Sequence, residues 1–401
     1  MNANMSAEAL ALQLSHTRKV RVPVTAATHR LFDAERPSLS ADLLDRLRQP
    51  GPEYDAEIAY ALSVMSGWCY SDAETLARKM PYYGLPEGSI QQIAVTNPAM
   101  FVVASAFFFR SACGRVGILA FRGTEPDNAV SWLTDADVVQ RNLGEGLVHQ
   151  GFYLNLRAIW DELADSFSDA LGPNAHGERE RSHATPPAAL ESLYLTGHSL
   201  GGAMAVLAAA KLTADFPTLK NVLKGVYTFG QPAVGDRAFV DQFAPSFGDR
   251  LFRHNFGRDL IPRLPPAWNG RYVHFGVLRA TANPKQPWAK QLVIPAQIVA
   301  VSLGFLAAAA SFVTRRLPAL ERLMLPYSLD DHCPTRYIEA SRAALKAQPV
   351  GAARDELDRA RDGSLIDKSQ SVTLKPDLRG ESGSLAVRSS PPRTRTRARS
   401  T

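Results

Sequence analysis

Hydrophobic side chains recur with two different periods along most of the chain. Between residues 55 and 80 they return at helical spacing, and an interruption near Gly67 predicts two helices there. A longer helical stretch covers 152–171. Runs rich in β-branched and aromatic residues predict strands over 91–95, 101–110, 116–121, 193–197, 222–230, 249–256 and 271–280. Helical patterns over 201–212 and 236–243 separate three of the later strands.

This alternation of strands and helices predicts an α/β fold with a mostly parallel central sheet and helices on both faces. We expect an N-terminal extension over 1–50, a folded domain over 51–345 and a disordered basic tail over 350–401, which lacks the apolar content needed to fold. Two insertions interrupt the domain. One is a polar, proline-containing loop at 172–189, and the other is an uncharged apolar segment at 292–313.

Charge and cysteine content narrow the range of partners. The whole chain has a formal charge of +6, but five arginines and no acid follow from Arg388 onward, so the other 387 residues carry only about +1. The excess of positive charge therefore belongs to the tail. We expect this tail to be disordered and exposed to solvent rather than bound to nucleic acid or anionic lipid. Three widely spaced cysteines form no metal-ligand pattern, so neither a metal nor another cofactor is expected.

The first 24 residues contain no apolar stretch that leads to a cleavage site. A cleavable secretory signal is therefore not expected. We expect the protein in the cytoplasm or at the periphery of a membrane, and a signal-independent route of export stays open.

The strongest chemical motif is GHSLG at 197–201, which lies directly after a strand-like run and directly before a helical pattern. A nucleophile elbow holds its serine in a tight, strained turn, so the positions two before and two after it must be nearly free of side chains. Gly197 and Gly201 meet this requirement. Ser199 is therefore the candidate nucleophile.

A serine nucleophile needs a histidine base and a carboxylate that orients the base. In α/β-hydrolases these groups follow in the chain order serine, acid, histidine. Three histidines lie beyond the motif. His254 falls inside a predicted strand and His274 is expected in the middle of another, whereas His332 lies in a loop-like segment and is the best base.

Asp259 is the best candidate for the acid, because it follows the strand predicted at 249–256 by a few residues. Asp330 and Asp331 are the alternatives. A carboxylate adjacent in sequence rarely reaches the ring nitrogen of its neighbouring histidine, and capping of the next helix explains both residues more simply.

Several ordered blocks resemble the class 3, fungal-type lipases of the α/β-hydrolase fold, over roughly residues 55 to 345. They are AFRGTE at 120–125, WLTDADV at 132–138, VHQGFY at 148–153, TGHSLGGA at 196–203, TFGQPAVGD at 228–236 and DLIPRLPP at 259–266. The resemblance implies the fold of that family, with Ser199 as nucleophile, Asp259 as acid and His332 as base. It also implies Thr124 and Leu200 as donors to an oxyanion hole.

The oxyanion hole has a physical basis of its own. Acyl transfer passes through a tetrahedral oxyanion, and one preorganised donor contributes roughly 3 to 4 kcal/mol to its stabilisation. Leu200 follows the serine at a predicted helix N-terminus, where its backbone N–H has no partner within the helix. Arg122 is expected to hold the neighbouring loop through an ion pair, and His149 and His198 are expected to form structural hydrogen bonds.

The apolar segment 292–313 has the length of a membrane span, since 22 helical residues run roughly 33 Å. A single crossing there would separate Asp259 from His332 by about 30 Å of hydrocarbon and so disrupt the triad. Three interpretations stay open: a helix buried against the domain, an apolar lid over the acyl-binding cleft, or a helix or shallow hairpin in the membrane interface.

We therefore expect a serine carboxylic-ester hydrolase that cleaves acyl esters of lipids, triacylglycerol or phospholipid, through an acyl-enzyme intermediate. Its partners would be the acyl-lipid substrate and a membrane or lipid interface contacted through 292–313. The alternative is a lipase-like module without catalytic activity that binds a membrane or another protein. The complete set of serine, acid and histidine favours the enzyme, because a binding module has no need for all three.

Overall fold

In the computed structural model of this chain the described residues are 16–24, 43–50, 53–85, 87–97, 102–124, 140–171, 189–216, 219–265, 271–283, 285–291 and 328–347. Several of the expected features lie outside these ranges. They are the polar loop up to residue 188, the WLTDADV block, the apolar segment 292–313 and the basic tail.

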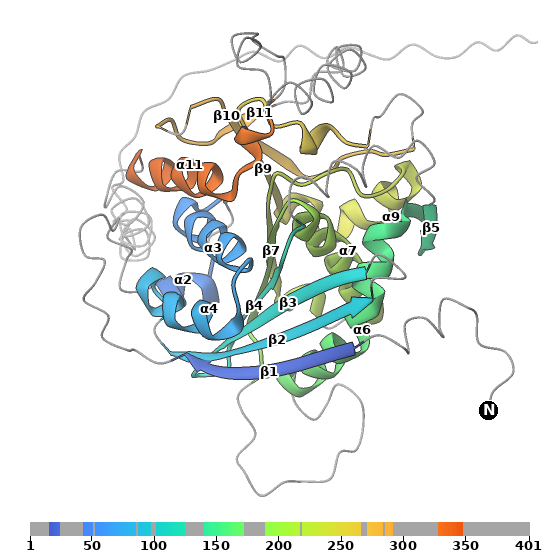
Figure 1. The fold of residues 1–401 in the computed structure, drawn as a ribbon. Coiled ribbons are helices and arrows are strands. Elements are labelled where there is room, and N and C mark those ends of the chain that lie inside the picture. Colours follow the sequence, from blue (N-terminus) through green and yellow to red (C-terminus); the bar gives the residue numbers. More distant parts are fainter. Residues whose placement is uncertain are drawn as a thin grey trace, which may run out of the picture. The chain divides into compact units, whose positions relative to one another are not determined.

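Among the described residues, nine strands form one sheet in the order β1-β2-β3-β4-β7-β8-β9-β10-β11 (Figure 1). Their bounds are β1 (His16–Val24), β2 (Gly88–Asn97), β3 (Val102–Ser111), β4 (Val116–Phe121), β7 (Ser192–His198), β8 (Leu223–Phe229), β9 (Leu251–Phe256), β10 (Val277–Thr281) and β11 (Ala289–Gln291). A separate hairpin joins β5 (Gln140–Leu143) to β6 (Gly146–His149).

The parallel sheet expected from the alternating pattern is confirmed for the central strands. Strands β4, β7, β8, β9 and β10 pair in parallel, whereas β1 to β4 and the pair β10–β11 are antiparallel. Only a short turn over 112–115 joins β3 to β4, and parallel neighbours need a longer crossover. The antiparallel pairing of β3 with β4 therefore follows from the absence of a helix between them.

Helices cover both faces of the sheet (Figure 1). One face packs against α6 (Gln150–Leu171), α7 (Leu200–Asp215) and α9 (Arg237–Phe247), and the other against α2 (Leu43–Arg48), α3 (Ala56–Trp68), α4 (Ala73–Lys79) and α11 (Pro334–Ala347). Leu195 and Val226 enter the first of these two cores, and Tyr194 and Tyr227 enter the second, as the alternation of side chains along a strand requires.

The remaining described elements are short. They are α8 (Leu219–Val222), η2 (Met80–Tyr83), η4 (Gly248–Arg250), η5 (Ile261–Arg263) and η9 (Asp330–His332). Among the helices described, none combines the length and the apolar character that crossing a bilayer demands.

The two helices predicted between residues 55 and 80 are α3 and α4. The side chain of Asp55 accepts hydrogen bonds from the first turn of α3, which fixes where that helix begins. The break falls near Gly67, as predicted, since Gly67 is the penultimate residue of α3. A Cβ at Gly67 would lie 2.8 Å from Cδ1 of Ile338, so this glycine allows α3 and α11 to pack closely.

Parts of the expected N-terminal extension belong to the domain. Strand β1 pairs with β2 along its whole length, from His16 to Val24. Leu43 and Leu47 of α2 are fully buried in the core. The domain therefore starts before residue 51. The sequence of β1 contains many charged residues because β1 is an edge strand, which has one neighbouring strand and tolerates charged side chains.

Candidate active site

Ser199 occupies the turn between β7 and α7. Its φ is 59° and its ψ is −129°, and it is the one non-glycine residue with positive φ in the described part of the chain. This backbone region is strained for a residue with a side chain, and such strain is concentrated at functional sites. The Ser199 N–H donates to the carbonyl oxygen of Phe229 across 2.9 Å, which ties the turn to the end of β8.

The glycines of the motif are required by close packing of backbone against backbone. A Cβ at Gly197 would clash with the backbone of Gly201, and a Cβ at Gly201 would clash with the carbonyl oxygen of Phe121 at the end of β4. The start of α7 therefore lies directly against β4 and β7. This is the elbow that the sequence pattern predicted.

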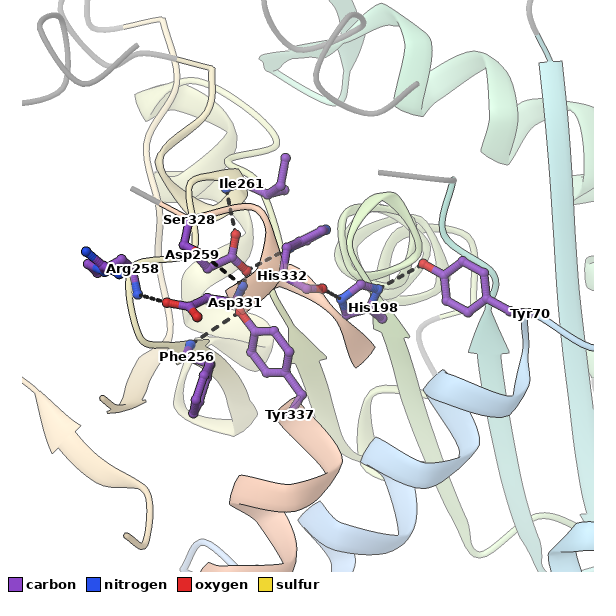
Figure 2. A network of polar contacts seen from close by, with 10 residues as sticks. All are labelled: Tyr70, His198, Phe256, Arg258, Asp259, Ile261, Ser328, Asp331, His332 and Tyr337. Atoms are coloured by element: carbon purple, nitrogen blue, oxygen red, sulfur yellow. Dashed lines mark hydrogen bonds and ion pairs between the residues drawn. The ribbon is translucent and has the colours of Figure 1, made fainter. Parts of the chain in front are cut away.

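The predicted acid and base meet in the structure (Figure 2). The Nδ1–H of His332 donates to Oδ2 of Asp259 across 2.7 Å, although the two residues are 73 positions apart in the chain. Both side chains are buried, with 0% and 1% exposure. Because Nδ1 donates to a carboxylate, Nε2 of the neutral imidazole is the nitrogen that can accept a proton.

His332 also lies beside the elbow. Its ring centroid is 4.5 Å from that of His198, the residue before Ser199. Within the described residues, Oγ of Ser199 and Nε2 of His332 are buried and have no hydrogen-bond partner. Unpaired polar atoms are rare in protein interiors, and reactive groups are one reason for them. These are the two atoms between which a triad would transfer a proton.

Two loops hold the predicted acid and base in place. The carboxylate of Asp331 accepts the backbone N–H of Arg258 across 2.7 Å, and the Ser328 N–H donates to the carbonyl oxygen of Arg258 across 2.9 Å. Asp331, considered above as an alternative acid or a helix cap, therefore clamps the loop that carries Asp259 (Figure 2).

A glycine after β8 makes room for the pair. Gly230 has a φ of 63°, in the left-handed region. A Cβ at Gly230 would lie 2.9 Å from Cε1 and Nδ1 of His332 and 3.0 Å from Oδ2 of Asp259. Both the backbone conformation and the close approach favour glycine at this position.

His198 forms structural hydrogen bonds, as expected. Its Nε2–H donates to the carbonyl oxygen of His332 across 2.7 Å, and its Nδ1 accepts the hydroxyl proton of Tyr70 across 2.8 Å. Burial, reinforced by the nearby His332, lowers the pKa of His198 well below the usual value. This neutral ring links the elbow to the segment that carries the base (Figure 2).

The other candidate histidines have structural partners. His254 lies inside β9, as predicted, and its ring bonds to the carbonyl oxygen of Thr228 at 3.0 Å. His274 was expected in the middle of a strand, but β10 starts at Val277, three residues later. The His274 ring donates to the Pro262 carbonyl oxygen across 2.7 Å. Burial lowers the pKa of each of these two histidines to about 3.

The predicted oxyanion donors lie on the two segments next to Ser199. Leu200 is the first residue of α7, where backbone N–H groups lack partners within the helix. Thr124 follows Gly123, whose Cβ, if present, would lie 3.2 Å from Cβ of Ser199. The loop that leads to Thr124 therefore runs beside the serine, and the roles of both donors stay predictions.

Arg122 and His149 were also expected to have structural roles near the elbow. The guanidinium of Arg122, for which an ion pair was expected, lies 5.9 Å from the ring centroid of Tyr70. His149 accepts the backbone N–H of Gly151 at Nδ1 and stacks on Phe152. No cluster of three or more His, Cys, Asp or Glu side chains suited to a metal ion occurs in the described part of the chain.

Sequence reasoning missed Tyr70 and Tyr337. The hydroxyl of Tyr337 donates to Oδ2 of Asp259 across 2.5 Å. Tyr70 lies in the turn after α3 and Tyr337 in the first turn of α11, and a lone tyrosine in such a place usually indicates core packing. No local pattern distinguishes a tyrosine whose hydroxyl reaches a distant carboxylate from one that only fills space.

Residues 118–269 match the family model described as lipase (class 3). The match contains Ser199 and Asp259 and ends before His332. Triacylglycerol lipase OBL1 of Arabidopsis thaliana is 29% identical over 274 residues, which cover 56% of this chain and 52% of the plant protein. Secreted mono- and diacylglycerol lipase A of Penicillium cyclopium is 29% identical over 226 residues, 55% of this chain and 62% of the fungal protein.

Among solved structures, a lipase from Rhizopus microsporus var. chinensis is 22% identical, with a TM-score of 0.47, over 69% of this chain and 84% of that one. Lipase II from Rhizopus niveus is also 22% identical, with a TM-score of 0.46, over 57% of this chain and 81% of that one. The chain covers about half of the length of the Arabidopsis relative, and less of two other plant relatives, at 34% and 40%.

Proposed function

Because this chain belongs to the class 3 lipase family and has its α/β-hydrolase fold, we propose that it is a serine hydrolase that cleaves acyl esters of lipids. The observation that carries the proposal is the hydrogen bond between His332 and Asp259 next to the strained Ser199 elbow. Relatives named as lipases of tri-, di- and monoacylglycerols support a glycerolipid substrate. Triacylglycerol and phospholipid are the two substrate classes to test.

The chemistry follows from the positions of the three side chains. Oγ of Ser199 attacks the ester carbonyl carbon while its proton passes to Nε2 of His332. The carboxylate of Asp259 holds the required tautomer and stabilises the imidazolium that forms. His332 then returns the proton to the leaving alcohol, which gives an acyl-enzyme. Water attacks this ester in a second cycle, with His332 again as the base.

The tetrahedral intermediate of each cycle carries a negative charge on the former carbonyl oxygen. The backbone N–H groups of Leu200 and Thr124, and the Thr124 hydroxyl, are the proposed donors to it. The N-terminus of α7 also contributes its partial positive charge. Among the groups named, none requires a cofactor.

The decisive experiment measures hydrolysis of emulsified triacylglycerol, phospholipid vesicles and soluble esters of increasing chain length, with wild-type protein and the Ser199→Ala variant side by side. Hydrolysis of lipid esters that disappears in the variant supports the proposal. If the wild-type protein hydrolyses none of these esters, the alternative of a binding module without catalytic activity is favoured. The profile across chain lengths and head groups identifies the preferred substrate.

Replacing Gly230 by alanine should lower kcat about a hundredfold, since small displacements of catalytic groups have effects of this size. The added methyl group would contact the His332 ring and Asp259 at 3.0 Å or less, and the φ of 63° disfavours any residue with a side chain. Gly114→Ala is the matched control, because Gly114 also has positive φ, at 74°, in the β3–β4 turn. Equal loss of kcat in both variants would show a general folding effect.

We also propose that residues 292–313 contact the lipid phase, which would place the protein at a membrane surface. The support is the sequence alone: 22 uncharged residues, flanked by Lys290 on one side and by Arg315 and Arg316 on the other. Apolar segments with basic flanks bind membrane interfaces through buried area and attraction to anionic lipid.

Replacing 292–313 by a Gly/Ser linker of equal length should reduce binding to anionic liposomes at least tenfold while short soluble esters are still hydrolysed. Equal length preserves the spacing between Asp259 and His332. The control is a Gly/Ser linker in place of the polar segment 172–188. Unchanged liposome binding, measured by co-sedimentation, would eliminate the proposed contact.

A further inference from the structure

Tyr337 lies in the first turn of α11, five residues after the proposed base. Its hydroxyl donates to Oδ2 of Asp259, the same oxygen that accepts the Nδ1–H of His332 (Figure 2). The two donors approach this oxygen at 2.5 Å and 2.7 Å. One carboxylate oxygen therefore connects the base to a phenol on the following helix.

The carboxylate of Asp259 depends on these donors because it is almost completely buried. Its Oδ1 accepts the backbone N–H of Ile261 across 2.8 Å. Its Oδ2 accepts from His332 and Tyr337. A buried carboxylate without donors favours the neutral acid, and each donor to the charged form favours the ionised one. Among the described residues, Tyr337 is one of three donors to this carboxylate.

The ring of Tyr337 is held by aromatic neighbours on several elements. Its centroid is 6.1 Å from that of Trp288, 6.2 Å from those of Phe229 and Phe256, and 5.6 Å from that of His198. The backbone N–H of Phe256 also donates to the phenolic oxygen across 3.3 Å. The surrounding rings fix the orientation of the Tyr337 side chain, so its hydroxyl loses little conformational freedom when it donates to Asp259.

We propose that Tyr337 is a positioning residue of the site: its hydroxyl holds the carboxylate of Asp259 turned toward His332 during ester hydrolysis. The proposal rests on the proposed function. It extends the triad to a fourth group that touches neither substrate nor Ser199. When His332 becomes an imidazolium, the second donor on Oδ2 also opposes transfer of the imidazolium proton to the carboxylate.

The test is Tyr337→Phe, which keeps the ring among its aromatic neighbours and removes only the hydroxyl. We expect kcat to fall about tenfold to a hundredfold with KM nearly unchanged, because the hydroxyl orients a catalytic group and does not contact substrate. The acidic limb of the kcat/KM profile should also move, because the variant lacks one donor to the charged partner of the base.

Tyr194→Phe is the matched control. Tyr194 is equally buried, at 1% exposure, and its hydroxyl has no hydrogen-bond partner among the described residues. Removing that hydroxyl should leave both kcat and the acidic limb unchanged. A merely structural role of Tyr337 would lower the melting temperature of Tyr337→Phe without moving the limb.

A second readout does not depend on activity. The Nδ1 proton of a histidine bonded to a carboxylate resonates at low field in the proton NMR spectrum, and this signal should shift in Tyr337→Phe and not in Tyr194→Phe. An unshifted signal together with an unchanged acidic limb would overturn the proposal. If the proposed function itself is wrong, the result differs: the wild-type protein would then show no ester hydrolysis that depends on Ser199.

Discussion

Alanine at position 199 is expected to lower kcat for lipid ester hydrolysis by about a millionfold, to the rate left by substrate binding and the oxyanion donors. In the proposed mechanism the Ser199 hydroxyl is the group that forms the acyl-enzyme, and alanine offers no replacement for it. KM should change little, because the methylene group that remains fills nearly the same space. Initial rates on emulsified triacylglycerol, measured at saturating substrate, give this ratio directly.

Ser192 is a closely matched control. It is the first residue of β7, the strand that leads into the elbow. Its side chain is fully buried, and its Oγ has no hydrogen-bond partner among the described residues, as for Ser199. Ser192→Ala should retain nearly full activity. Hydrolysis that persists in Ser199→Ala at more than a few per cent of the wild-type rate would rule out the serine mechanism.

The second large effect is expected for Asp259→Asn, with kcat about ten thousandfold lower at neutral pH. An amide in this position presents N–H groups to Nδ1 of His332, so the ring adopts the tautomer that carries its proton on Nε2. That nitrogen then cannot accept the proton of Ser199. The shape of the side chain is conserved, so the melting temperature separates this effect from unfolding.

Asp331→Asn tests whether Asp331, rather than Asp259, is the acid. Asp331 accepts the Arg258 N–H through Oδ2, and an asparagine keeps an oxygen acceptor for this bond. The loss of kcat should stay within about tenfold, as for a hydrogen bond that is weakened rather than removed. A larger effect of Asp331→Asn than of Asp259→Asn would reverse the assignment of the acid.

Much of the fold was predictable from local patterns. The alternation of strands and helices predicted the parallel strands β4, β7, β8 and β9, because the long crossover between parallel neighbours usually contains a helix. Strands β2, β3 and β4 differ, since only the short segments 98–101 and 112–115 join them and they pair antiparallel. Strand β1 escaped prediction because its charged residues resemble those of a solvated segment when its pairing partner is unknown.

The glycines at fixed distances on either side of Ser199 were enough to predict the elbow, and chain order was enough to select Asp259 and His332 as candidates. The spacing of the glycines and the order of serine, acid and histidine are both properties of the linear sequence, so no structure is needed to recognise them. Three contacts became apparent only in the folded chain: Asp331 accepts a hydrogen bond from the loop of Asp259, Gly230 leaves space for Asp259 and His332, and Tyr337 donates to Asp259. Each of these contacts joins segments brought together by packing of the sheet and α11, and a one-dimensional pattern contains no information on such distances.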